Sequence, residues 1–153
     1  MSNATASRHL TVSCSSCDTL NRVDLARLED RPRCANCGQL FLLDRPQAVS
    51  GEALDRIVAG TEVPVLIDFY ADWCGPCGFM APVLDEFARD RAGEVLVGKL
   101  DTDRDSDVAV RFGIRGIPTL IVFSDGCEVA RQVGVVPRSD LDALVDWVET
   151  PAT

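Results

Sequence analysis

Long apolar runs are missing from this sequence of 153 residues. No stretch reaches the roughly 18 consecutive apolar residues that indicate a transmembrane helix, which excludes a membrane-spanning protein. Residues 1–10 are polar and lack the apolar segment of a secretory signal peptide. We therefore expect a protein that works in the reducing cytoplasm without a membrane partner. We also expect the lone histidine, His9, to lie in a solvated tail.

Positive charge is also scarce, because the chain has a formal net charge of −9. Residues 1–46 carry six Arg against five Asp or Glu, a formal +1, whereas residues 47–153 carry nine basic against nineteen acidic residues, a formal −10. A nucleic-acid-binding module is expected to show a basic stripe. The small cluster of Arg27, Arg31 and Arg33 is more typical of a solvated face, so we expect no nucleic-acid partner.

Cysteine, in contrast, is plentiful, with seven copies, and two of them form a C-G-P-C motif. Cys74 and Cys77 lie between an apolar, strand-like run at 65–70 and a run at 80–87 whose apolar residues follow a helical spacing. Cys74 is therefore expected at the N-terminus of a helix, where free backbone N–H groups and the helix dipole stabilise a thiolate. Cys77, one turn further along, is expected to be protonated and shielded.

The spacing of three places both sulfurs on the same side of the first helical turn, so Cys77 can resolve a mixed disulfide that Cys74 forms with a substrate. The pattern predicts a redox-active dithiol. Its alternatives are a structural disulfide, half of a zinc site or two unrelated cysteines. A His between the thiols would make the disulfide strongly oxidising, but Gly75 and Pro76 carry no such charge, which favours a reducing pair.

Motifs spread over residues 63–148 match one known pattern. In chain order they are Asp68-Phe69, Ala71, Trp73 to Cys77, Ala81-Pro82, Leu84 to Glu86, Lys99-Leu100, Phe112 to Thr119 and Val133-Gly134. This region resembles thioredoxin nearly end to end. The resemblance implies an α/β thioredoxin fold, in which helices flank a mixed central sheet, and a thiol-disulfide oxidoreductase that reduces disulfides in client proteins. It also implies an NADPH-dependent thioredoxin reductase as partner, and we expect no organic cofactor.

Asp68 stands in the middle of the strand-like run at 65–70, where a carboxylate is costly if the strand is covered on both faces. Burial should raise its pKa. From the residues alone, an edge-facing surface position is the more common outcome. The resemblance instead implies that Asp68 moves a proton to and from Cys77, and that Lys99, the one lysine in the chain, pairs with it from the neighbouring strand.

Pro118 follows Ile117 just before a predicted strand, and most X-Pro bonds are trans. The resemblance implies a cis bond, which brings this loop against the two sulfurs and leaves the Ile117 backbone free to hydrogen-bond a substrate segment. It also implies a flat apolar docking surface formed by Trp73, Gly75, Pro76, Ile117 and Gly134. Gly78 and Tyr70 depart from the family pattern, which often has Lys or Arg at the first position and Trp at the second.

Two further C-x-x-C pairs come earlier in the chain, at Cys14 and Cys17 and at Cys34 and Cys37. Two such knuckles can bring four thiolates to one tetrahedral Zn²⁺ ion, and Gly38 can adopt the positive φ that closes the second turn. Iron and a pair of structural disulfides are the alternatives. The pattern predicts a zinc ribbon stabilised by its metal. A ribbon before a thioredoxin domain resembles the bacterial thioredoxin-2 type.

The sequence divides at Arg45-Pro46 into a zinc-ribbon module at 1–46, with disordered first residues, and a thioredoxin domain at 47–153. A βαβ unit followed by a hairpin predicts a mixed sheet. Strands are expected at 10–12, 20–23, 39–43, 47–49, 65–70, 95–100, 119–123 and 128–133, and helices at 51–60, 77–90, 106–111 and from Ser139.

The resulting hypothesis is a monomeric protein-disulfide reductase with a structural zinc site. One alternative is a zinc-controlled redox sensor or holdase, in which oxidation ejects the metal and exposes apolar surface. Another is a binding adaptor that keeps the fold without turnover. Cys127, the seventh cysteine, is either inert or a site of mixed-disulfide dimerisation or oxidative regulation.

Overall fold

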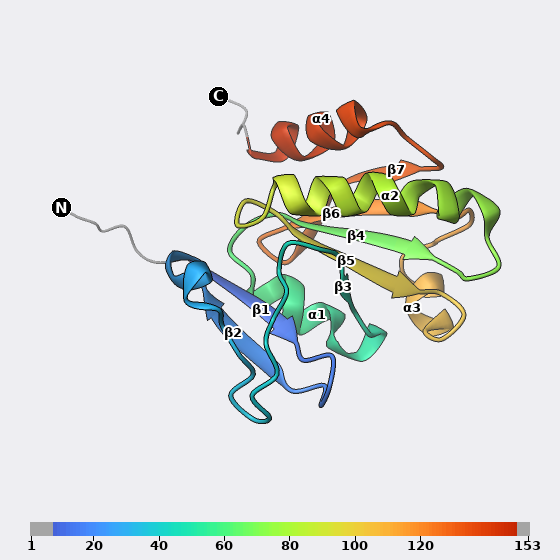
Figure 1. Ribbon diagram of the computed structural model, residues 1–153. Coiled ribbons are helices and arrows are strands. Elements are labelled where there is room, and N and C mark those ends of the chain that lie inside the picture. Colours follow the sequence, from blue (N-terminus) through green and yellow to red (C-terminus); the bar gives the residue numbers. More distant parts are fainter. Residues whose placement is uncertain (1–7, 150–153) are drawn as a thin grey trace.

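The larger of two sheets is mixed and carries helices on both faces (Figure 1). The structure is a computed structural model that describes residues 8–149, so the predicted disorder of the first residues lies outside the described part. The first three strands across the sheet are parallel to one another, and each of the last two runs antiparallel to the strand before it, which confirms the predicted mixed sheet. In spatial order the strands are β3 (Gln47–Ala48), β5 (Leu96–Asp101), β4 (Val65–Tyr70), β6 (Thr119–Ser124) and β7 (Cys127–Val133).

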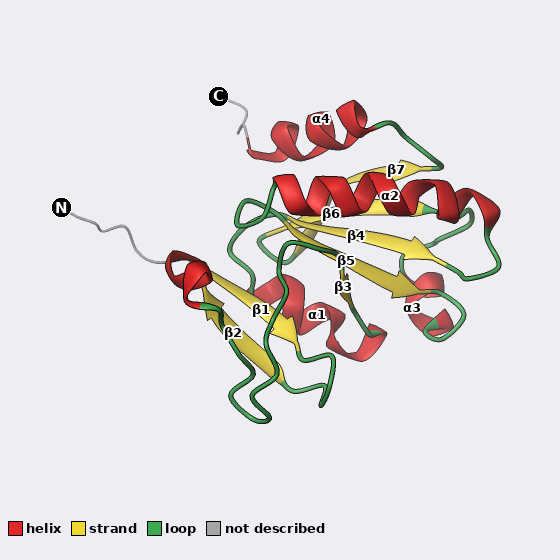
Figure 2. Ribbon diagram, viewed as in Figure 1, coloured by secondary structure: helices red, strands yellow, loops and turns green. Residues whose placement is uncertain are grey.

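Two helices cover each face of this sheet (Figure 2). They are α1 (Gly51–Gly60) and α3 (Ser106–Arg111) on one face, and α2 (Gly75–Asp90) and α4 (Arg138–Glu149) on the other. Successive side chains of a strand point to opposite faces. Ile67 and Phe69 of β4 therefore pack with the α1 side of the core, whereas Leu66 packs with α2 and α4. Asp68 alternates with its neighbours and shares the α2 face with Leu66.

The smaller sheet pairs β1 (His9–Ser13) with β2 (Leu20–Asp24) and is followed by a 3-10 helix, η1 (Leu25–Asp30). Its apolar side chains do not form a core of their own. Leu10, Val12 and Val23 are buried in the same cluster as Ile57 of α1 and Ile67 of β4. The N-terminal module is thus packed on the α1 side of the larger sheet, as Figure 1 shows.

A short hydrogen-bonded joint fixes β1 to the end of α1. The Thr11 hydroxyl donates to the Gly60 carbonyl at 3.1 Å, and the Thr11 N–H donates to the hydroxyl of Thr61 at 3.0 Å. His9 accepts from the N–H of Glu62 through its backbone carbonyl at 2.9 Å, and its ring Nδ1 lies 3.2 Å from the Glu62 carboxylate. The expectation of a solvated tail for His9 is therefore wrong, because His9 begins β1 and hydrogen-bonds to Glu62, just after α1.

Most predicted elements are confirmed, and the differences have local causes. Residues 39–43 form no strand, because Leu40 makes only an isolated bridge with Arg33 and finds no partner strand. α2 begins two residues earlier than expected, since Pro76 needs no N–H partner in a first turn. α4 begins at Arg138, one residue before the expected Ser139. Within residues 8–149, no helix has the length and apolar character needed to span a membrane.

Candidate active site and metal centre

Cys74 is the N-cap residue of α2, as the sequence predicted. Its Sγ accepts a hydrogen bond from the backbone N–H of Cys77 at 3.2 Å. The Cys74 N–H in turn donates to the carbonyl of Ala71, just after β4, at 3.2 Å. The donor at Cys77 and the positive end of the helix dipole both favour negative charge on the Cys74 sulfur.

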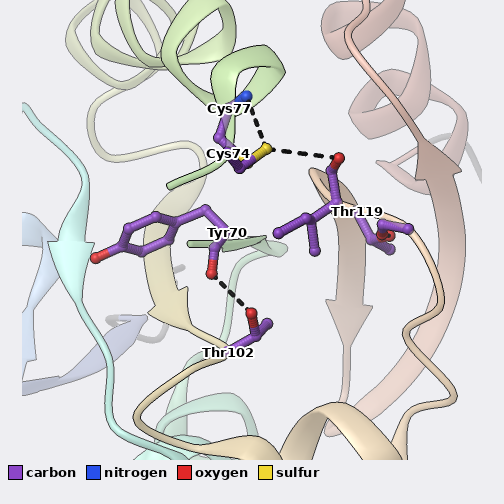
Figure 3. The surroundings of a disulfide bond; sticks show 7 residues. Tyr70, Cys74, Cys77, Thr102 and Thr119 are labelled. Carbon is purple, nitrogen blue, oxygen red and sulfur yellow. Dashed lines mark hydrogen bonds between the residues drawn. A yellow bond between two sulfur atoms is a disulfide. The ribbon is translucent and has the colours of Figure 1, made fainter. Parts of the chain in front are cut away.

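Cys74 and Cys77 are joined by a disulfide, with their Cα atoms 5.3 Å apart (Figure 3). Each of the two residues is 7% exposed. The expected contrast between an open Cys74 and a covered Cys77 is therefore absent from this oxidised state. The bond holds both sulfurs together under the loop at Ile117, whose carbonyl oxygen lies 3.7 Å from Cys74 Sγ.

The rim around the disulfide is open and largely apolar. Trp73 is 72% exposed, Gly75 and Pro76 are exposed, and Ile117 is half-buried. The peptide bond between Ile117 and Pro118 is cis, as the resemblance implied. Gly134 has a φ of +94°, and its N–H donates to the Pro118 carbonyl at 2.8 Å. The structure therefore places the loop at 117–118 between the disulfide and Gly134.

Asp68 is buried in β4, with 1% of its surface exposed. Burial raises its pKa to about 6, and the positive charge of Lys99 opposes this rise. Asp68 and Lys99 are direct partners in the parallel register of β4 and β5. The described residues provide no hydrogen-bond donor to Asp68 Oδ1. A buried carboxyl group on the α2 face with a pKa near neutrality can accept and return a proton.

The four cysteines of the N-terminal module converge on one point. Their sulfurs all lie within 4.8 Å of one another, with Sγ–Sγ distances of 3.5 Å for Cys14 and Cys37 and 3.6 Å for Cys17 and Cys34. Zinc–sulfur bonds of about 2.3 Å in a tetrahedron separate the sulfurs by about 3.8 Å, so the donor set fits a four-thiolate ion. The geometry matches a metal site and does not by itself select the metal.

Each knuckle is closed by a residue with positive φ. Gly38 has a φ of +82° and its N–H donates to the Cys34 carbonyl at 2.9 Å, as predicted. Asp18 plays the same part after the first pair, with a φ of +61° and an N–H bond of 2.9 Å to the Cys14 carbonyl. Sequence reasoning missed Asp18, because Asp adopts this conformation less often than glycine.

Sequence reasoning also missed two asparagines that donate to the sulfurs. Asn36 Nδ2 lies 3.5 Å from Cys17 Sγ, and this contact is the main cause that lowers the pKa of Cys17 to about 6. Asn21 Nδ2 lies 3.4 Å from Cys34 Sγ. Asn36 sits inside its C-x-x-C pair and could have been noticed, whereas only the fold of β2 brings Asn21 to the cluster.

Comparison with known families fits this geometry. Residues 45–148 match the family model described as Thioredoxin. The chain belongs to the thioredoxin family. Residues 13–39 match a second model, described as Thioredoxin 2, N-terminal. The protein is therefore a thiol-disulfide oxidoreductase of the thioredoxin-2 type, with Cys74 and Cys77 as its active-site pair.

Individual thioredoxins resemble this chain over the same region. A thioredoxin from Pseudomonas aeruginosa is 45% identical over 98 residues, which cover 64% of this chain and 91% of that protein. The chloroplastic M-type thioredoxin of Pisum sativum is 42% identical over 100 residues, covering 65% of this chain but 58% of the pea protein. A solved structure of a mutant Halobacterium salinarum thioredoxin superposes with a TM-score of 0.67 at 35% identity, covering 74% of this chain and 98% of that one.

Proposed function

We propose that this protein reduces disulfide bonds in cytoplasmic client proteins, with Cys74 as the attacking thiolate. The observation that carries the proposal is the position of its sulfur. Cys74 caps α2, its Sγ accepts the Cys77 N–H, and its chain neighbours Trp73, Gly75 and Pro76 are exposed. A thiolate stabilised in this way beside an open apolar rim is suited to meet the disulfide of another protein.

The chemistry needs two thiol exchanges and no external oxidant. The Cys74 thiolate attacks one sulfur of the client disulfide, the client S–S bond breaks, and a mixed disulfide forms while the first client sulfur leaves as a thiolate. Asp68 then accepts the proton of Cys77, whose thiolate attacks Cys74 Sγ and releases the second client sulfur. The client gains two electrons, which Cys74 and Cys77 lose as their disulfide forms. Of the two protons that the client thiolates take up, one comes from Cys77 by way of Asp68 and the other from solvent, because Cys74 starts as a thiolate.

The loop at Pro118 supports docking in this proposal. The Ile117 carbonyl oxygen lies 3.7 Å from Cys74 Sγ, so the backbone here is close enough to the sulfurs to pair with an extended client segment. The docking surface comprises Trp73, Gly75, Pro76, Ile117 and Gly134. Lys99, in register with Asp68, adjusts the proton affinity of that carboxyl group. An NADPH-dependent thioredoxin reductase would regenerate the dithiol, and the protein would act as a monomer.

The metal in this proposal is Zn²⁺, held by Cys14, Cys17, Cys34 and Cys37 in a structural role. Four thiolates are soft ligands, and a metal without redox chemistry of its own suits a protein that handles thiols. The division of the chain at residues 46 and 47 stays a prediction.

Insulin reduction driven by dithiothreitol tests the main proposal. Cys74→Ser should lower turnover to the background rate, and Cys77→Ser should accumulate a mixed disulfide visible on a non-reducing gel. Cys127→Ser is the matched control, because this exposed thiol lies at the start of β7 and should not affect the rate. Normal turnover by Cys74→Ser would refute the proposal.

One feature keeps the redox-sensor alternative open. Cys37 is exposed, whereas Cys14 and Cys34 are buried. An oxidant would therefore reach the four-cysteine cluster at Cys37 first. Titration with peroxide would support a sensor if metal were released at doses that leave Cys74 reducible by dithiothreitol. Metal retained until Cys74 itself is overoxidised would exclude one.

A further inference from the structure

Lys99 makes a contact that sequence reasoning did not foresee. Its Nζ lies over the ring of Tyr70, 4.6 Å from the ring centroid. Both residues are half-buried. An ammonium group over an aromatic face at this distance is attracted by the electrons of the ring. Tyr70 is also one of the two departures from the thioredoxin pattern noted above, at a position where Trp, another aromatic residue, is common.

The register of the sheet shows why the contact matters to Asp68. Asp68 pairs with Lys99, and Tyr70, two residues on, points to the same face. Tyr70 also packs against the apolar cluster that holds Cys74 and Cys77. The ring therefore contacts both the Lys99 ammonium and the apolar cluster of the disulfide, and Lys99 is the register partner of Asp68 on the neighbouring strand.

Other charges near the ring would draw the ammonium elsewhere. Asp72, Asp101 and Arg104 interact electrostatically with Tyr70, and Asp72 is exposed just beyond the end of β4. β6 places the apolar Leu120 opposite Asp68. Without the ring, water and the two outer carboxylates would therefore compete for the ammonium, and these outer carboxylates are accessible at lower cost than the buried Asp68.

We propose that Tyr70 is a positioning residue, whose ring holds the Lys99 ammonium on the Asp68 face of the sheet, where its positive charge favours the ionised carboxylate. The inference deepens the proposed function, since it rests on Asp68 as the group that serves Cys77. A flat aromatic surface is the requirement, and the hydroxyl of Tyr70 is not.

The test is a carbon-13 NMR titration of the Asp68 carboxyl group in the oxidised protein, where Cys74 and Cys77 do not titrate. Tyr70→Leu should raise the pKa of Asp68 by about one unit, as expected when a nearby positive charge moves into water. Tyr70→Phe and Tyr70→Trp keep a ring and should titrate like the parent protein. Lys99→Met should raise the pKa at least as much, and adding Tyr70→Leu to it should change nothing further.

Activity gives a second readout. A rise of about one unit from about 6 would lower the ionised fraction of Asp68 about twofold at pH 7 and about fivefold at pH 6. The insulin rate of Tyr70→Leu should fall with this pH profile, whereas a change in packing alone would lower the rate equally at both values. If Asp68→Asn has no effect on the rate, the proposed function of Asp68 fails while the titration still reports on Tyr70.

The parent protein provides a check that does not depend on a folded variant. The single lysine gives one set of side-chain signals, and its ε-methylene protons should be shifted upfield by the Tyr70 ring. Absence of this ring-current shift would overturn the proposal. An unchanged or lowered Asp68 pKa in a folded Tyr70→Leu variant would overturn it as well.

Discussion

A single residue, Asp68, shows the conflict between stability and chemistry in this protein. Its carboxyl group is buried, and its pKa is raised from 3.8 to about 6, mainly by burial. The folded state therefore binds a proton that the unfolded state releases between these values. Asp68 therefore costs the fold almost no stability below about pH 4. The destabilisation grows between about pH 4 and pH 6 and is fully present above about pH 6. At neutral pH the ionised form destabilises the fold.

Asp68→Asn should therefore stabilise the protein most at high pH. The shift of about two units corresponds to about 3 kcal/mol, so the gain in free energy of unfolding at pH 8 should exceed the gain at pH 4 by up to about 3 kcal/mol. Urea unfolding of the oxidised parent and variant proteins at both pH values measures this difference. Asp103→Asn, at an exposed position, is the control and should show no such difference. An equal gain in the free energy of unfolding at pH 4 and pH 8 would contradict a raised pKa for Asp68.

At the scale of elements, two arginines clamp α4 to α2. Arg138 lies within 3.1 Å of Glu86, Asp90 and Asp142, and its guanidinium stacks 5.2 Å from the Phe87 ring centroid. Arg91 contacts the same Asp142 at 2.9 Å and lies 5.5 Å from the same ring centroid. A shared network over an aromatic ring contributes more than a single exposed ion pair.

Arg138→Ala should lower the free energy of unfolding by about 1–2 kcal/mol, because it removes ion pairs and the packing of the stem over Phe87. Arg27→Ala is the matched control, since its ion pair with Asp30 is 3.2 Å long but has side chains 73% and 65% exposed. Arg27→Ala should lower the free energy of unfolding by less than about 0.5 kcal/mol. Urea unfolding at pH 7 compares the two. Equal losses would show that the network adds nothing.

Across the whole molecule, the metal site and the redox domain share one apolar core. Buried Cys14 and Cys34 lie in the same cluster as Leu54 of α1 and Phe69 of β4. The joint at Gly60 is also tight, because a Cβ there would approach the Thr11 Oγ1 to 2.2 Å. The N-terminal module is therefore coupled to the domain by packing as well as by the chain.

Removal of the metal should therefore destabilise the entire chain. In the reduced protein, a strong chelator should lower the melting temperature of a single cooperative transition by about 10 °C or more, because metal binding free energy is part of the folding free energy. Differential scanning calorimetry measures this, and adding Zn²⁺ back should restore the original transition. Two separate transitions, the second one unchanged, would show that the modules unfold independently.

Sequence reasoning reached the local features and missed those that depend on distant neighbours. The cap at Cys74, the strand at 65–70 and each of the two C-x-x-C knuckles follow from residues close in the chain. The bond from Asn21 to Cys34 and the contact of Lys99 with Tyr70 depend on how separate strands meet. The equal burial of Cys74 and Cys77 was missed because it belongs to the oxidised state, which a sequence does not specify.

One atom serves both the architecture of α2 and the reaction. In this oxidised state the neutral Cys74 sulfur accepts the Cys77 N–H, and an anionic sulfur in the reduced protein would be a stronger acceptor. The first turn of α2 should therefore be held more firmly in the reduced protein than in the oxidised protein. A protein that contacts this turn would therefore meet a more rigid helix start in the reduced state than in the oxidised state.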